Sequence, residues 1–390
     1  MQRFYFDHNA STPVSPAVVE VLVPALLEVY GNGSSIHHYG QTAKQRLEQA
    51  RREVAQLLHC DPKEIVFVSG GTESDNLAIQ GVVRSSLAGR KHVVTTSIEH
   101  PAVLNTCRQL EQEGVDVTFV GVGSDGLVDP SDIRRAMRPE TVLVSVMHAN
   151  NELGSIQPLE EIAAITREAG VPLHSDGVQA AAKIPVDVHA LGVDLYSITG
   201  HKFYAPKGIG ALFVKKGTKL AAMQHGGRHE QGMRPGTENV PGAIALGRAA
   251  ALALADLPQE SRRLTALRDL LESGLLARVP SSGVNAGGAL RTPNTTSIYF
   301  DGLDGDALVI SLDLKGFAVS SGAACSSGAV EPSHVLLAIG LSKERARSTL
   351  RFSLGRSTTA EQVHALVDAV AQSVAQLRKL SPTYAGARHE

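Results

Sequence analysis

Short apolar runs alternate with longer segments of helical periodicity along the first two thirds of the chain. Runs such as 65–68 and 141–147 are apolar at nearly every position, which predicts strands buried on both faces. Segments such as 41–58 carry apolar residues three and four positions apart, which predicts amphipathic helices. This alternation of strand and helix predicts an α/β fold, in which helices cover both faces of a mostly parallel sheet.

The expected elements can be placed along the chain by number. Strands are expected at 4–6, 65–68, 92–98, 117–122, 141–147, 171–174, 193–198 and 209–214. Helices are expected at 16–30, 41–58 and 131–137, and from about Ser74, Pro101 and Pro158. Ligands of such sheets bind beyond the carboxyl ends of the strands, so the residues that follow each strand are the candidates for chemistry.

The last third of the chain predicts a second unit. Residues 241–256 predict a long Ala/Leu helix, and 259–278 a second, charged helix that leads into that unit. Residues 295–378 then alternate strand and helix three times, which predicts a smaller α+β domain. Because 390 residues exceed what one core comfortably holds, we expect a large domain at 16–257, a small domain at 258–390, and an N-terminal segment, 1–15, that packs with the small domain.

Composition narrows the class of protein. The chain is 43% hydrophobic with a net charge of −2, so it has no basic excess that would indicate nucleic-acid binding. Its first residues lack the pattern of a signal peptide, and no uncharged apolar run is long enough to suggest a membrane span. Three scattered cysteines predict neither a disulfide framework nor a metal site. We therefore expect a cytoplasmic enzyme.

A glycine-rich turn at 69–72 joins a predicted strand to a predicted helix. Its glycines let the backbone approach an anion, the helix start offers free N–H groups, and Thr72 adds a hydroxyl. The turn lacks the Gly-Lys-Ser/Thr of a Walker motif, so a phosphate is expected there rather than a nucleoside triphosphate. An ordinary capped turn is the alternative.

A lysine and a carboxylate end two successive strands. Lys202 follows the strand 193–198, where a desolvated amine could attack a carbonyl. Asp176 ends the preceding strand and could hold a heterocyclic nitrogen protonated, with Gln179 nearby to donate to a phenolate oxygen. Neighbouring parallel strands would bring both onto one edge of the sheet. A solvated lysine and a helix-capping aspartate are the alternatives.

Further polar residues follow other strands. His100, before Pro101, could stack on a ring or move protons, or could be structural. Asn150 and Asn151 could hold a carboxylate, or could form a polar turn. The glycine-rich segment 226–237, which ends in Thr237, reads as a loop that binds an anion or reaches a second subunit.

The predicted small domain contributes a thiol and an arginine. Cys325 lies among small residues at 320–328 without apolar periodicity, which favours an exposed nucleophilic thiol. Cys60 and Cys107 lie in helical patterns and are expected to fill the core. Arg351, in a short strand, could clamp a carboxylate bidentately or be a surface charge. A phosphate site, a carboxylate and a lysine are together the set that pyridoxal phosphate requires.

From Tyr5 to about Leu377 the chain resembles the cysteine desulfurases, the sulfur-mobilising branch of the class V aminotransferase superfamily. The resemblance rests on ordered segments: FDHNAST, SGGTESDN, SIEHPAV, HANNELG, HSDGVQ, TGHKFYAPKGIG, GMRPGT, SSGAACSSG and LRFSLGR. The segment around Cys325 resembles that of group I. The resemblance implies the pyridoxal phosphate-dependent transferase fold of type I, with a large domain built on a mostly parallel seven-stranded sheet.

The resemblance also implies roles for the candidate residues. Lys202 would carry pyridoxal phosphate covalently and act as the base, Asp176 would pair with the pyridine nitrogen, and Gln179 with the ring oxygen. His100 would stack on the ring and help move protons. The phosphate would be bound by Gly71, Thr72, Thr199, His201 and, from the neighbouring subunit of a homodimer, Thr237. The substrate carboxylate would be bound by Asn151 and Arg351, and Cys325 would accept sulfur.

The implied reaction removes sulfur from L-cysteine, leaving L-alanine and a persulfide on Cys325. The sulfur would pass to an acceptor such as an iron–sulfur scaffold protein, or serve thiolation of tRNA or other cofactors. The chain ends in SPTYAGARHE, shorter than the tail of many group I members, so the resemblance does not identify the acceptor. A related lyase, such as a selenocysteine lyase, and a catalytically silent binding subunit are the alternatives.

Overall fold

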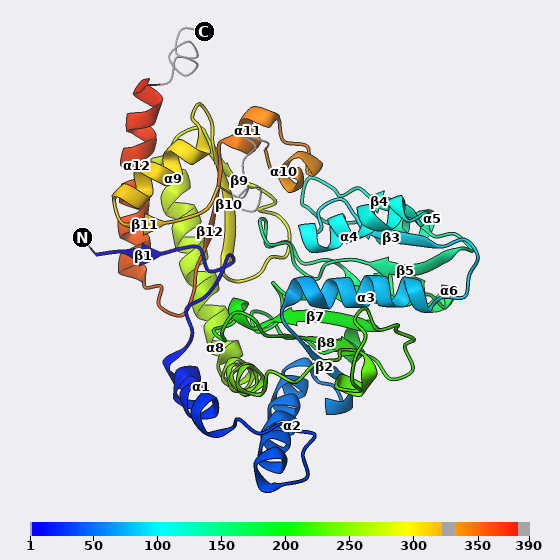
Figure 1. Ribbon diagram of the computed structural model, residues 1–390. Helices are drawn as coiled ribbons and strands as arrows, with labels where there is room; N and C mark the ends of the chain where they lie inside the picture. Colours follow the sequence, from blue (N-terminus) through cyan, green and yellow to red (C-terminus); the bar gives the residue numbers. More distant parts are fainter. Residues whose placement is uncertain (1, 322–331, 381–390) are drawn as a thin grey trace.

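The computed structural model describes residues 2–321 and 332–380. Its largest element is a seven-stranded sheet of order β2-β8-β7-β6-β5-β3-β4 (Figure 1). The strands in that order are Ile65–Val68, Gly210–Val214, Leu195–Thr199, Leu173–Asp176, Thr141–Ser145, His92–Thr96 and Asp116–Val120. Strand β8 runs antiparallel to β2 and β7, and the other pairs are parallel. The predicted α/β fold with a mostly parallel seven-stranded sheet is therefore confirmed.

Alternate residues of β2 and β8 enter two different cores, which is why these strands are apolar throughout. On one face, α3 (Gly71–Ser85) and α4 (Pro101–Gln112) pack against residues such as Val66 and Leu212. On the other face, residues such as Phe67 and Phe213 share a core with α2 (His38–Leu58), α6 (Leu159–Ala169) and the first half of α8 (Val240–Arg278). The remaining helices here are α1 (Pro16–Glu28), α5 (Pro130–Ala136) and α7 (Val188–Leu191).

A second core lies around a three-stranded antiparallel sheet, of order β12-β10-β9 (Figure 1). Its strands are Thr349–Ser353, Thr295–Phe300 and Ser282–Val284. The helices α9 (Gly305–Leu314) and α12 (Ala360–Leu380) pack on it together with the second half of α8. Two short helices, α10 (His334–Ala338) and α11 (Lys343–Arg347), precede β12.

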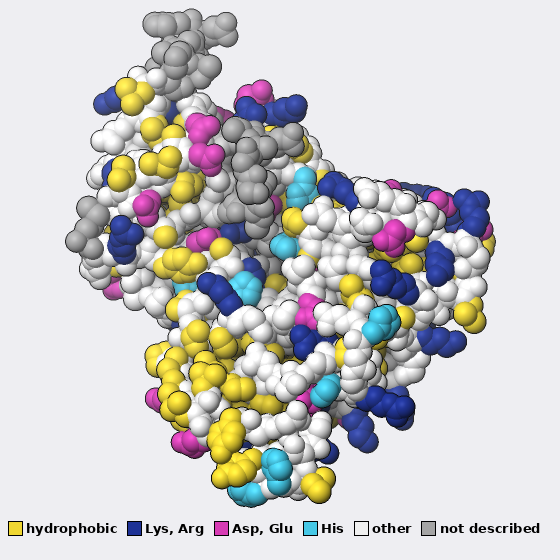
Figure 2. Space-filling model, in the orientation of Figure 1, with side chains coloured by type: hydrophobic (Ala, Val, Ile, Leu, Met, Phe, Trp, Pro, Cys, Tyr) yellow, Lys and Arg dark blue, Asp and Glu magenta, His cyan; other side chains and the backbone are white. Residues whose placement is uncertain are grey.

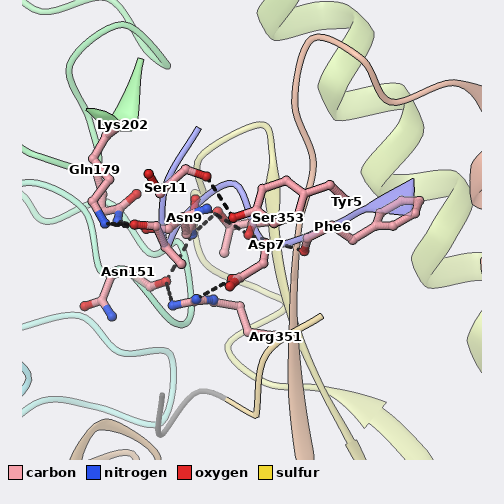
Figure 3. A network of polar contacts seen from close by, with 12 residues as sticks. Tyr5, Phe6, Asp7, Asn9, Ser11, Asn151, Gln179, Lys202, Arg351 and Ser353 are labelled. Carbon is pink, nitrogen blue, oxygen red and sulfur yellow. Dashed lines mark hydrogen bonds and ion pairs between the residues drawn. The ribbon is translucent and has the colours of Figure 1, made fainter. Parts of the chain in front are cut away.

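The start of the chain joins this second core. Strand β1 (Phe4–Tyr5) pairs in parallel with β11 (Phe317–Ala318), and the Phe6 side chain is fully buried in the same cluster. The residues after Phe6 then run along the boundary between the two cores, toward the carboxyl ends of the large sheet (Figure 3).

Helix α8 joins the two cores, and here the structure differs from the sequence prediction of two helices. Its 39 residues continue through Pro258. Proline removes one N–H donor, but the helix persists because buried leucines on both sides of it, Leu257 and Leu264, belong to packed surfaces. The helix is long and apolar enough to cross a membrane, yet 61% of its most apolar window is buried inside the protein. A division of the chain at residue 258 stays a prediction, because α8 crosses it without a break.

Candidate active site

A cavity of about 240 Å³ opens at the carboxyl ends of the strands of the large sheet, where the second core meets them. Its lining contains most of the predicted site residues: Gly71, Thr72, His100, Asn151, Asp176, Gln179, Thr199, His201, Lys202 and Arg351. It also contains five residues that were not predicted: Asn9, Ala10, Asp75, Met147 and Val178. A concave site where several strand ends converge is the usual place for a ligand in this class of fold.

Lys202 and Asp176 reach this cavity from neighbouring strands. Strands β6 and β7 pair in parallel, with Asp176 opposite Ser197, and Lys202 ends the single 3₁₀ turn, Gly200–Lys202, that follows β7. The expectation that both lie on one edge of the sheet is met. The Lys202 Nζ donates to two backbone carbonyls of the N-terminal segment, Asn9 O at 2.6 Å and Ala10 O at 2.9 Å.

The start of α3 forms an anion-binding surface beside Lys202. The first hydrogen bond within the helix is donated by Ser74 to Gly70 O at 3.0 Å, so the N–H groups of Gly71, Thr72 and Glu73 precede it. No side chain of the described residues caps this helix at Gly70. A Cβ on Gly71 would come within 2.9 Å of Val178 Cγ2, so glycine permits this close approach. The arrangement suits a phosphate.

The next two strand ends supply an imidazole and an amide. His100 caps α4, its Nδ1 accepting from Ala102 N at 3.1 Å, and Pro101 begins the helix as predicted. Burial lowers the pKa of His100, which favours the neutral ring. Asn151 lines the cavity, whereas the Asn150 side chain donates to Ile98 O at 3.0 Å and accepts from Glu152 N at 2.9 Å in the turn that follows β5.

Arg351 enters the cavity from β12 of the second core. Its Nη2 donates to Asp7 Oδ1 at 2.7 Å, and its Nη1 to Asn151 O at 3.2 Å (Figure 3). Its Nε is buried and has no hydrogen-bond acceptor in the part of the chain that the structure describes. A guanidinium with a buried, unmatched N–H suits a planar anion such as a carboxylate.

Asn9 lies at the centre of the network in Figure 3 and was missed by the sequence reasoning. Its carbonyl accepts from Lys202 Nζ and from Gln179 Nε2, the latter at 3.0 Å. Its side-chain Nδ2 donates to Asn151 O at 3.0 Å and to Thr295 Oγ1 at 2.8 Å. One 2%-exposed residue thus ties the two cores together at the cavity. Its position just after the first predicted strand was the only signal in the sequence.

Besides His100, three further titratable groups of the cavity have shifted pKa values. Burial, and then the charge of Asp176, hold the pKa of Asp75 well above its usual value. Burial also raises the pKa of Asp176, while the charges of His100 and Lys202 oppose that rise. Asp75 is therefore the neutral member of the carboxyl pair, and a cation bound near Asp176 would stabilise its carboxylate. Burial and the charge of Lys202 lower the pKa of His201 to about 4.

The other sequence-based expectations have different outcomes. Thr237 is exposed and is not among the residues that line the cavity. Cys325 lies outside the described residues. Cys107 is fully buried in α4 as predicted, whereas Cys60 is partly buried just beyond the end of α2. Burial raises the pKa of both of these thiols to about 12, so neither is suited to act as a nucleophile.

Comparison with known proteins gives matches over nearly the full chain. The aminotransferase class-V family matches residues 4–366. A protein named cysteine desulfurase IscS from Dictyoglomus turgidum is 43% identical, covering 98% of this chain and 97% of its own length. A cysteine desulfurase from a Nostoc species is 44% identical, covering 98% of this chain and 95% of its own length.

Solved structures agree with these matches. A structure titled NifS-like protein superposes with a TM-score of 0.91 at 35% identity, covering 96% of this chain and all of the other. A structure titled SspA in complex with cysteine has a TM-score of 0.80 at 37% identity, covering 90% of this chain and 98% of the other. The chain therefore belongs to the class-V aminotransferase family and, within it, to the cysteine desulfurases.

Proposed function

We propose that this chain removes sulfur from L-cysteine with bound pyridoxal phosphate, releasing L-alanine and leaving a persulfide on Cys325. The observation that carries the proposal is that Lys202, Asp176, the uncapped start of α3 and Arg351 face one cavity. The relative titled SspA in complex with cysteine supports cysteine as the substrate.

The residues present fit pyridoxal phosphate. The phosphate would be bound by the first N–H groups of α3, with hydroxyl and imidazole groups from Thr72, Thr199 and His201 around it. Asp176 would receive the pyridine nitrogen: its Oδ1 already accepts from Val178 N at 2.9 Å, and a cationic ring nitrogen would offset the burial of its charge. Gln179 would donate to the ring oxygen, and His100 would stack on the ring.

The coenzyme, when bound, supplies an electron sink that makes the substrate's α-proton acidic. Lys202 would take this proton as the general base, and Asp176 would keep the ring nitrogen protonated. Arg351 and Asn151, which both line the cavity, hold the substrate carboxylate. This fixes which bond of the α-carbon faces Lys202.

Sulfur leaves in a separate step. The Cys325 thiolate attacks the substrate sulfur, an S–S bond forms, and the C–S bond breaks with its electron pair on the carbon side. Protonation of that carbon leads to alanine, and Cys325 keeps the sulfur as a persulfide. The persulfide then serves an acceptor protein, such as an iron–sulfur scaffold, or thiolation of tRNA or other cofactors. We propose a cytoplasmic protein that does not bind membranes or nucleic acid.

A homodimer would complete the site, with Thr237 of one subunit reaching the phosphate held by the other. An exposed apolar surface on α1 and the segment after it supports this proposal (Figure 2). It includes Leu27, Tyr30 and Ile36, which are 72%, 68% and 95% exposed. Apolar surface of this kind commonly covers a protein interface. Analytical ultracentrifugation should therefore give twice the monomer mass.

The proposed function is tested by coenzyme uptake. Purified chain mixed with pyridoxal phosphate should gain a visible absorption band that survives desalting, and Lys202→Ala should lack that band because no amine remains to hold the coenzyme covalently. A colourless wild-type protein that takes up no coenzyme would favour the silent binding subunit instead. Cys325→Ser separates the desulfurase from a selenocysteine lyase, since only the desulfurase requires this thiol to release sulfide from cysteine.

A further inference from the structure

Lys183 lies one turn after Gln179 and touches two polar side chains at the wall of the cavity. Its Nζ donates to Asn9 Oδ1 at 2.9 Å and, in a shorter contact, to Gln179 Oε1. None of the chemistry described above uses this amine. Lys183 is partly buried, and burial together with the charges of Lys202 and Arg351 holds its pKa well below the usual value.

The contacts of Lys183 determine which way two amides face. Asn9 Nδ2 is committed to Asn151 O and Thr295 Oγ1, so Asn9 Oδ1 must face Lys183. A lysine Nζ that lies beside two oxygens must donate a hydrogen bond to each of them. Both the charged and the neutral amine have the two N–H groups that this requires. The oxygen of Gln179 is thereby held on the Lys183 side.

The opposite end of the Gln179 amide then faces the cavity. One N–H of Nε2 donates to Asn9 O at 3.0 Å. The second N–H remains for a ligand, because a carboxamide nitrogen carries two. Without Lys183 only Asn9 O would hold the amide, and the Gln179 side chain would be free to tilt so that its second N–H no longer points at the cavity.

We propose that Lys183 is a positioning residue that holds the Gln179 amide with its N–H directed at the ring oxygen of bound pyridoxal phosphate. The proposal rests on the proposed function. A donor at this oxygen stabilises its negative charge and weakens its hold on the proton that it shares with the Lys202 nitrogen. Losing that donor should raise the pH at which this proton leaves.

The test is the pH midpoint of the visible band of the holoenzyme. In Lys183→Met and in Gln179→Leu the midpoint should rise by about one pH unit, the effect of losing one hydrogen bond to a charged group. The double variant should rise no further than Gln179→Leu alone, because Lys183 acts through Gln179. Lys183→Arg, which keeps the donors, should restore a midpoint near that of the wild type.

Lys91→Met is the matched control. Lys91 is also partly buried and donates to one oxygen, Val83 O at 2.7 Å. It lies just before β3, at the amino end of that strand, whereas the cavity lies at the carboxyl ends of the strands. Its loss should leave the midpoint unchanged. If Lys183→Met does not fold, Lys183→Ser replaces it, since a short polar side chain cannot reach Gln179 Oε1, and the same rise is expected.

The outcomes separate this proposal from the proposed function. A wild-type protein that binds no pyridoxal phosphate would refute the proposed function. A midpoint that moves in Gln179→Leu but not in Lys183→Met or Lys183→Ser would overturn the positioning role while leaving the proposed function intact. Additive rises in the double variant would also overturn it, because Lys183 would then act independently of Gln179.

Discussion

Two buried arginines, Arg51 and Arg351, show how differently the same side chain is used. Both are nearly inaccessible, at 7% and 5% exposure. Arg51, on α2, has every nitrogen matched: Nη1 and Nη2 each lie 2.7 Å from an oxygen of Glu230, and Nε lies 3.2 Å from Glu48 Oε1. Its guanidinium also stacks over the Phe67 ring, 4.7 Å from the centroid.

Arg351 is matched only in part. It pairs with Asp7 and with Asn151 O, while its Nε has no acceptor among residues 2–321 and 332–380. A buried donor without an acceptor lowers the free energy of unfolding, so Arg351 stabilises the fold less than Arg51 does. Burial alone therefore does not distinguish the two arginines. Arg351 differs from Arg51 in lining the cavity and in having a buried N–H without an acceptor among the described residues.

Replacing each arginine by lysine should separate the two roles, with the larger effect at the cavity. Arg351→Lys keeps a charge beside Asp7 but loses the planar set of donors, so kcat/KM for L-cysteine should fall about 10- to 100-fold. Thermal stability should change little. Steady-state kinetics and a melting curve on the same preparation measure both. A variant with full activity would remove Arg351 from the substrate site.

Arg51→Lys should show the reverse pattern. Lysine cannot pair with both oxygens of Glu230 and also reach Ile65 O, so the free energy of unfolding should fall by about 2 kcal/mol. Urea denaturation measures the loss, and kcat/KM of the folded holoenzyme should stay within about twofold. A large fall in activity without loss of stability would show that the contrast between the arginines is wrong.

A buried carboxyl, that of Glu99, extends the comparison to a group of the opposite charge. Burial raises the pKa of Glu99 to about 8 from an ordinary 4.5, and its Oε2 lacks a partner in the described structure. The folded state therefore keeps a proton that the unfolded state releases between these values, so Glu99 lowers stability as pH rises from 4.5 to 8.

The Glu99→Gln variant has no titratable group at this position, so its free energy of unfolding does not include this decrease with pH. Its stability relative to the wild type should rise by on the order of 3 kcal/mol between pH 5 and 8. Urea denaturation of both proteins at several pH values measures the difference. A difference that does not change with pH would mean that Glu99 is ionised in the folded protein throughout this range.

The sequence predicted those features of the structure that depend on local patterns of apolar and polar residues. The sheet, most of its helices and the residues at strand ends follow from periodicity, because the strand that precedes Asp176 or Lys202 also places it at the cavity. Resemblance to a family added roles for these residues that no local pattern contains.

The residues missed are those whose partners are far away in the sequence. Asn9 meets Lys202, Gln179 and Thr295 only after the two cores assemble, and nothing near it in the sequence distinguishes it from a polar turn. The sequence around Lys183 does not distinguish it from other lysines that follow a helical turn. The continuous α8 was missed because Pro258 is a local signal that long-range packing overrides.

The desulfurase reaction is tested most directly by incubating the holoenzyme with L-cysteine and a thiol reductant and measuring alanine and sulfide together. We expect equal amounts of the two, and loss of sulfide release in Cys325→Ser. Sulfide accompanied by pyruvate and ammonia instead of alanine, or undiminished sulfide release by Cys325→Ser, would contradict it.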